Sequence, residues 1–252
     1  MCAPALLYAG GSRDDWGFGL PKIGNGRMVT SEKSISPFWS IQIEGSAIVN
    51  FHVSQDFRAV VTVDSNLEEY TRVYTQNQVL NIGTKKRGNY QFTNYTVDVY
   101  APRFEGLSIS GAARFEGMDK ITISSFKLNI SGLGKIEGSF ECNSFSTSIS
   151  GSGNINIYVI SHDFNASVSG AADIALAGST KEMNISVLGS GDLNGTEFVT
   201  QNADVQISGS GKIDIWVLEN LKVNISGAGR VRYRGSPKVD YTGSGSGRLE
   251  SI

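Results

Sequence analysis

Eight segments between Leu107 and Leu249 are near copies of one short phrase. Each copy is centred on a Ser-Gly pair or, once, on Leu188-Gly189, and the central residue recurs every 18 to 21 residues. The copies are LSISGAARF, LNISGLGKI, TSISGSGNI, ASVSGAADI, ISVLGSGDL, VQISGSGKI, VNISGAGRV and YTGSGSGRL. A period this short corresponds to one coil of a solenoid. The repeat therefore predicts the architecture, and a stack of near-identical coils leaves little room for a catalytic pocket.

Within each copy, apolar and polar residues alternate with a period of two. The position before the central residue is branched and apolar: Ile109, Ile130, Ile149, Val168, Val187, Ile207 and Ile225. The position before that is always polar: Ser108, Asn129, Ser148, Ser167, Ser186, Gln206, Asn224 and Thr242. A second apolar column follows five residues after the centre: Phe115, Ile136, Ile155, Ile174, Leu193, Ile213, Val231 and Leu249. Each copy is therefore predicted to form two strands, each with one buried face.

Stacking these coils pairs each strand in parallel with its counterpart in the next coil, about 4.8 Å away. The predicted fold class is all-β, a single-stranded parallel β-helix with about 18–21 residues per coil. Right-handed winding is the expected hand. A glycine follows the central residue in every copy, and we expect it to turn the corner with a positive φ.

The regular coils are expected to cover residues 107–252. Residues 35–106 show the same pattern in degenerate form and are predicted to be irregular N-terminal coils, which makes 35–252 one β-helix domain. Irregular terminal coils are expected because the end of a solenoid exposes strand edges. Residues 1–34 are predicted to be an N-terminal segment, a signal or linker remnant.

The segment WSIQIEGSAIV carries the coil pattern into this degenerate region. It places Trp39, Ile41 and Ile43 in the inward phase and Gly45 at the corner. Gly45 precedes Gly111 by 66 residues, which is room for about three coils. The segment SNLEEYTRV is expected to end a strand and begin a short helix, with Ser65 or Asn66 as its N-cap.

Composition limits the classes of partner and compartment. The net charge of −2 argues against a general nucleic-acid binder, and no segment is long and apolar enough to span a membrane. The cysteines, Cys2 and Cys142, have no metal-ligand spacing, and Cys142 is expected to be a small packing residue. Three explanations of the apolar start stay open: a trimmed signal peptide, a leader added for expression, or a lipoprotein cysteine at Cys2.

The chain resembles a bacterial family described as "Putative auto-transporter adhesin, head GIN domain". The shared features are IQIEGSAIV, an SNLEEY-like element, Ala101–Pro102 leading into SISG, runs of SGSGxI, and RGSPKV at Arg234–Val239 before a final SGSG. The resemblance covers roughly residues 36–252. It implies a β-helical, envelope-associated or secreted bacterial domain, and it brings no catalytic motif.

The sequence offers few residues for chemistry. His52 and His162 stand in unrelated contexts, and each is expected to be a surface or packing residue. Asp173 and Asp192 share a column, but the dense aspartate pattern of calcium-binding solenoids is missing. The corner glycines lack the helix and the GKS or GKT of a phosphate loop. No catalytic, cofactor-binding or metal site is therefore predicted.

One candidate surface lies near the C-terminal end, where basic residues recur in outward columns beside an aromatic side chain. We call it the basic stripe: Lys212, Trp216, Arg230, Arg232, Arg234 and Arg248. Stacked arginines beside an exposed indole fit an acidic or sugar-containing polymer. Charges at a solenoid end also discourage edge-to-edge stacking, so both interpretations stay open.

These observations predict a non-enzymatic extracytoplasmic module, an adhesin-like or cell-envelope scaffold that presents an elongated binding surface. The expected location is the bacterial cell envelope, periplasmic or surface-exposed, and the partner is a glycan, an envelope polymer or a protein. One alternative is a polysaccharide-processing enzyme, although such enzymes need loop-built grooves with clustered acids and bases. The other is a self-assembling module of bactofilin type, and a homo-oligomer stays open.

Overall fold

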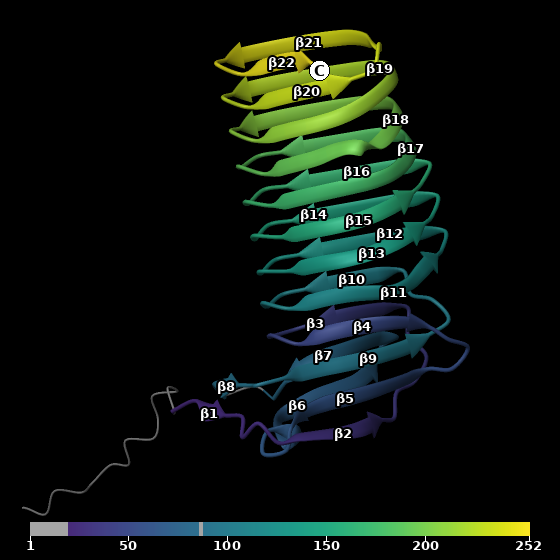
Figure 1. Cartoon of the computed structure of the whole chain (residues 1–252), viewed down its shortest axis with the longest axis vertical. Coiled ribbons are helices and arrows are strands. Elements are labelled where there is room, and N and C mark those ends of the chain that lie inside the picture. Colours follow the sequence, from purple (N-terminus) through teal and green to yellow (C-terminus); the bar gives the residue numbers. More distant parts are fainter. Residues whose placement is uncertain (1–19, 86–87) are drawn as a thin grey trace, which may run out of the picture.

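In a computed structural model, which describes residues 20–85 and 88–252, the chain winds into a parallel β-helix (Figure 1). The regular coils are built from β10 (Gly106–Ile109), β11 (Arg114–Thr122), β12 (Ser125–Ile130), β13 (Lys135–Glu141), β14 (Ser144–Ile149), β15 (Asn154–Ile160), β16 (Asp163–Val168), β17 (Asp173–Val187), β18 (Asp192–Gly209), β19 (Lys212–Gly227), β20 (Arg230–Arg234), β21 (Lys238–Gly245) and β22 (Arg248–Ser251). From β17 onward, one bent strand often serves as the second strand of one coil and the first of the next.

The register between coils follows the columns of the sequence. Ile130 pairs with Ile149, and Ile149 pairs with Val168. All seven residues of the column before the central residue are buried. This confirms the parallel β-helix and the inside-outside phase predicted from the alternation.

Phenylalanine rings form a stack inside the regular coils. The ring centroids of Phe126 and Phe145 are 5.4 Å apart, those of Phe145 and Phe164 are 5.6 Å apart, and Phe104 meets Phe126 at 5.3 Å. Each ring is at most 2 % exposed. Because Phe126, Phe145 and Phe164 are paired in register on successive coils, burial and aromatic contact act together along the axis.

The N-terminal strands are β1 (Lys22–Ile23), β2 (Met28–Lys33), β3 (Ser40–Ile43), β4 (Ile48–Val53), β5 (Arg58–Asp64), β6 (Thr71–Gln76), β7 (Val79–Thr84), β8 (Tyr90–Gln91) and β9 (Tyr95–Ala101). The coil made of β3 and β4 stacks directly on β10 and β11, and on its other side lie β7 and β9. The prediction of about three coils between Gly45 and Gly111 is therefore wrong. These two glycines lie in adjacent coils, and the residues between them fold back to the outer side of β3 and β4 (Figure 1).

The N-terminal end of the solenoid is closed by antiparallel strands. β5 lies between β2 and β9, and β6 pairs with β7, in each case antiparallel. β2 belongs to the segment expected to precede the domain, so that part of the segment is integral to the fold. The predicted helical turn exists as a 3₁₀ helix, Glu68–Tyr70, but its N-cap is Leu67 and no side chain caps it. Cys2 lies outside the described residues.

Two sequence expectations about individual residues fail here. Trp39 is not inward but 42 % exposed, because the neighbouring Phe38 takes the buried place, and Arg103 lies over the indole at 5.2 Å. The corner glycines do not generally need a positive φ: in the eight repeats only Gly227 and Gly245 have one at this position.

The corner glycines are required instead by the close approach of neighbouring coils. A Cβ on Gly151 would lie well under 3.0 Å from the carbonyl oxygen of Gly132, and one on Gly170 equally close to that of Gly151. The same conflict recurs from Gly111 to Gly245. Since backbone meets backbone at this corner, only hydrogen fits on the α-carbon.

Candidate functional site

One face of the solenoid carries an unbroken row of uncharged polar side chains. It is formed by the column that the sequence predicted to be outward, and two N-terminal strands extend it. We call it the polar ladder: Asn81, Gln42, Ser108, Asn129, Ser148, Ser167, Ser186, Gln206, Asn224 and Thr242, each paired in register with the next. Adjacent strands lie about 4.8 Å apart, so the ladder offers one hydrogen-bonding group per coil at that spacing.

Most of the ladder has unused hydrogen-bonding capacity. From Ser108 to Thr242, none of its side chains bonds another side chain or backbone group within residues 20–85 and 88–252. The two N-terminal members do have partners, since Gln42 donates to Glu44 at 2.9 Å and Asn81 to the Val79 carbonyl at 3.0 Å. Hydroxyl and amide groups both donate and accept. The eight repeat members can therefore bond an outside ligand without first breaking an internal bond.

In the neighbouring outward columns, by contrast, side chains bond to their counterparts in adjacent coils. Asn184 donates to Asn165 at 3.1 Å, and Lys222 is 3.1 Å from Asp204. These columns also contain charges of both signs, whereas the polar ladder contains none.

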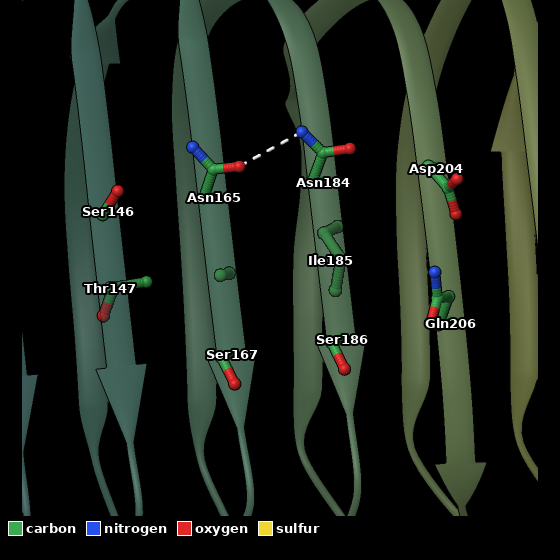
Figure 2. A pocket seen from close by; sticks show the side chains of 10 residues that line it. Ser146, Thr147, Asn165, Ser167, Asn184, Ile185, Ser186, Asp204 and Gln206 are labelled. Atoms are coloured by element: carbon green, nitrogen blue, oxygen red, sulfur yellow. Dashed lines mark hydrogen bonds between the residues drawn. The ribbon is translucent and has the colours of Figure 1, made fainter.

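Grooves run beside the ladder. Figure 2 shows one of about 360 Å³ between two rows of side chains: Ser146, Asn165, Asn184 and Asp204 on one side, and Ser167, Ser186 and Gln206 on the other. A second groove, of about 220 Å³, follows the ladder toward the N-terminal coils, between Ser108, Asn129 and Ser148 and the corner serines Ser110, Ser131 and Ser150. The face is thus a corrugated surface lined by hydroxyl and amide groups, and both grooves are open.

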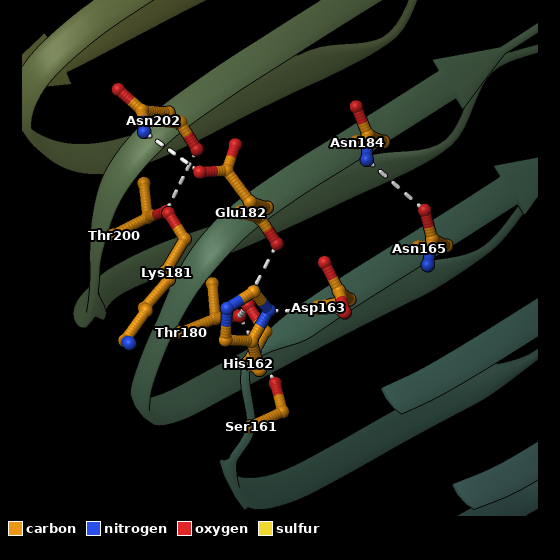
Figure 3. A network of polar contacts seen from close by, with 10 residues as sticks. All are labelled: Ser161, His162, Asp163, Asn165, Thr180, Lys181, Glu182, Asn184, Thr200 and Asn202. Carbon is orange, nitrogen blue, oxygen red and sulfur yellow. Dashed lines mark hydrogen bonds and ion pairs between the residues drawn. The ribbon is translucent and has the colours of Figure 1, made fainter. Parts of the chain in front are cut away.

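A separate polar network lies at the second corner of the central coils (Figure 3). Ser161 donates to the hydroxyl of Thr180 at 3.0 Å, and Thr180 can donate to the His162 carbonyl at 3.0 Å. Thr200 repeats this one coil later, where its hydroxyl can donate to the Lys181 carbonyl at 3.2 Å. Both threonines are buried, so the network satisfies backbone carbonyls at the bend and is structural.

The histidines lie apart from each other on the surface. His162 Nδ1 is 3.1 Å from Asp163, and His52 Nε2 is 3.7 Å from Asp98 while its ring stacks on Tyr100 at 4.7 Å. Among the described residues there is no cluster of three or more His, Cys, Asp or Glu that could hold a metal ion. In the same part of the chain, no helix has the length and apolarity needed to cross a membrane.

The basic stripe has the register expected from the sequence, since Lys212 pairs with Arg230, Arg230 with Arg248, and Trp216 with Arg234. Two of its cationic side chains are already paired with carboxylates. Lys212 is 3.4 Å from Asp192, and Arg232 forms a two-pronged contact with Asp214 that raises the pKa of the guanidinium.

The remaining stripe residues differ in whether another side chain already contacts them. Arg234 covers the half-buried Trp216 ring at 4.2 Å, so that face of the indole is occupied. Arg230 and Arg248 have no ion pair to any described residue.

The sequence pattern identified eight members of the polar ladder only as an outward column, and it missed Gln42 and Asn81. Their signal was available in SIQI and VLNI, which repeat the alternation of the regular strands. Their place in the ladder follows from β7, β3 and β10 being neighbours, and the chain order hides that arrangement.

Comparisons with known proteins agree with this architecture. The family model "Putative auto-transporter adhesin, head GIN domain" matches residues 37–237. A crystal structure of a putative adhesin from Parabacteroides merdae is 23 % identical, with a TM-score of 0.80 over 92 % of this chain and 98 % of that one.

Two crystal structures from Parabacteroides distasonis, a putative adhesin and a putative lipid binding protein, are 23 % and 21 % identical. Each has a TM-score of 0.80; the alignments cover 91 % and 92 % of this chain and 99 % of each of theirs. At these identities the likeness establishes the fold alone. The comparison with curated proteins gave no match.

Proposed function

Because the chain belongs to the family described as "Putative auto-transporter adhesin, head GIN domain", we propose that it is a non-enzymatic, extracytoplasmic adhesion module whose polar ladder binds a glycan. Its place is the bacterial cell envelope, periplasmic or surface-exposed. The observation that carries this proposal is the row of eight consecutive hydroxyl and amide side chains with free hydrogen-bonding capacity, one per coil.

The chemistry of the ladder favours a neutral, hydroxyl-rich polymer. The ladder has no charge, so it offers no ion pair to an acidic or basic ligand. Its members repeat about every 4.8 Å, which is similar to the length of one sugar ring in an extended polysaccharide. A single exposed hydrogen bond contributes only about 0.5–1.5 kcal/mol. Useful affinity therefore requires many such bonds made together, and a ladder of this length supplies them.

An enzymatic role has less support. The regular coils differ by three residues at most, so they carry no long loops to enclose a substrate. The acidic and basic side chains of the opposite sheet are largely paired with one another, as in Lys212–Asp192 and Arg232–Asp214. A surface that binds a polymer over many coils needs neither an enclosed pocket nor a titratable pair.

The basic stripe is a second candidate surface, for an acidic polymer. The observation in its favour is that Arg230 and Arg248 lie one coil apart in register without a carboxylate partner among the described residues. Their guanidinium groups are suited to two-pronged bonds with carboxylate or sulfate.

A polysaccharide array that includes neutral and acidic polymers tests both candidates. The ladder variant Ser148→Lys/Ser186→Lys places two bulky charged side chains on the ladder, two coils apart. The control Asn156→Lys/Asn194→Lys introduces the same charged side chains on the opposite sheet, also two coils apart. We expect the wild type and the control to bind a neutral polymer and the ladder variant to bind it at least tenfold more weakly.

Salt separates the two surfaces. Binding of a neutral polymer to the ladder should be nearly unchanged by added salt, whereas binding to exposed arginines should weaken because exposed charges are screened over about 8 Å at physiological ionic strength. Retention of acidic polymers alone, lost in Arg230→Ser/Arg248→Ser, would assign the function to the basic stripe. Equal binding of neutral polymers by the ladder variant and its control would overturn the ladder.

A further inference from the structure

The two ends of the solenoid are built differently. At the C-terminal end, all eight residues of β21 are exposed. Val239 and Tyr241 are 38 % and 42 % exposed, although they continue the columns of Leu221 and Val223, which are 1 % exposed. The apolar interior of the last coil is therefore open to solvent.

The same end has open strand edges. β21 pairs only with β19, and β22 pairs only with β20, among the described strands. Their outer edges therefore present unpaired backbone N–H and C=O groups on both sheets, with an apolar strip between them. Such an edge is a template for pairing with another strand.

The N-terminal end is different, although β2 and β6 each keep one unpaired edge there, since among the described strands they pair only with β5 and β7, respectively. There the last layer contains antiparallel strands, and its inward residues Val61, Val63 and Leu67 are at most 1 % exposed. Because only the C-terminal end combines free strand edges with an exposed apolar interior, stacking through such ends stops at two molecules and does not continue into a filament.

We propose that two copies of this chain associate through their C-terminal ends, with β22 of one copy pairing antiparallel to β22 of the other about a two-fold axis. A molecule that covers this end must present two strand edges with an apolar strip between them. The two edges must be separated by the width of one coil. The C-terminal end of a second copy is a surface of that kind.

The charges of β22 fit this arrangement. Its sequence is Arg248-Leu249-Glu250, so antiparallel pairing centred on Leu249 places Arg248 opposite Glu250 of the second copy, twice in each dimer. Opposite charges facing each other across an antiparallel pair are stabilising, and like charges are destabilising. Partly buried Leu249 would then meet Leu249 of the second copy and be covered.

Sedimentation equilibrium over a concentration series tests the association. The wild type should be a dimer, and Arg248→Glu should weaken dimerisation at least tenfold, because Glu then faces Glu250. Adding the second change, in Arg248→Glu/Glu250→Arg, restores opposite charges across the axis and should recover most of the dimer. The control Lys127→Glu changes an exposed lysine far from this end and should behave as the wild type.

Hydrogen exchange of the wild type at low and high concentration locates the interface without any variant. Backbone amides of β21 and β22 should exchange more slowly in the dimer, whereas those of β2 should not change. The proposal is overturned by a wild type that stays monomeric at every concentration, by growth beyond two copies, by failure of the double charge swap in a variant that melts as the wild type does, or by protection elsewhere.

Discussion

Replacing the corner glycine Gly151 with alanine should destabilise the protein more than its small size suggests. The added Cβ would lie well under 3.0 Å from the carbonyl oxygen of Gly132 in the preceding coil. That oxygen also accepts a hydrogen bond from the amide of Ser152 at 3.0 Å. Relief of the clash requires the two coils to separate at this corner, and the separation lengthens the hydrogen bond.

The magnitude follows from three contributions. Overpacking a rigid contact costs about 1–3 kcal/mol, and loss of the hydrogen bond adds about 0.5–1.5 kcal/mol. Alanine restricts the unfolded chain more than glycine does, and this effect offsets about 0.4–1 kcal/mol of the loss in stability. The net loss is about 2 kcal/mol. At roughly 2–4 °C per kcal/mol for a chain near this length, Tm should fall by about 4–8 °C.

The matched control is Gly153→Ala, two residues further along the same corner. Its Cβ would lie 3.3 Å from Cγ2 of Ile149, a side-chain atom that can move. Two other coils already carry alanine at the equivalent position, Ala113 and Ala172. The control should change the free energy of unfolding by less than about 0.5 kcal/mol. Thermal melts followed by circular dichroism compare the two variants, and equal Tm values would refute backbone approach as the reason for glycine.

Three further outcomes are expected. Ile149→Asp buries an unpaired carboxylate and should cost several kcal/mol, whereas Ser148→Asp on the exposed ladder should cost about 0.5 kcal/mol; similar urea midpoints would contradict the inside-outside phase. Burial raises the pKa of the Cys142 thiol to about 11, so alkylation at pH 8 should be slow in the native protein and fast in urea, and rapid native labelling would contradict this. For Asp64, burial by itself raises the pKa, but backbone N–H donors including that of Gly26 at 2.8 Å outweigh it, so the folded pKa lies below the ordinary value. The stability it contributes is complete above the unfolded pKa, about 3.9, and is lost as pH falls through the folded pKa; Asp64→Asn should remove this acid sensitivity, and unchanged pH dependence of unfolding would argue against it.

The regular coils could be predicted from sequence because each of their rules is local. Alternation fixes which side chains are buried, and a fixed step between copies sets the register, as the pairing of Ile130 with Ile149 confirms. The N-terminal layer could not be predicted, because the stacking order there departs from the chain order. A strand-to-strand contact between β3 and β10 leaves no trace in the spacing from Gly45 to Gly111.

The basic stripe shows a different limit. Its column positions were predictable, and so was part of its charge pairing. Asp192 and Asp214 precede Lys212 and Arg232 at the same position of the coil, so the sequence held the signal that these cations would be engaged. The cover of Trp216 by Arg234 required side-chain geometry, since either residue alone fits an exposed surface.

The corner glycines also bear on where function can reside. Backbone contact between coils holds the strands in register, so a side chain in an outward column stands directly beside its counterparts in the coils before and after it. Within such a column a charge either meets an opposite charge, as Lys222 meets Asp204, or repels its neighbour. The polar ladder avoids both, because no member is charged and from Ser108 onward no side chain is bonded within the described chain. Stability does not account for a row of unused donors and acceptors over eight coils, since each exposed group is solvated equally well in the unfolded chain. The proposed glycan would meet these groups in series.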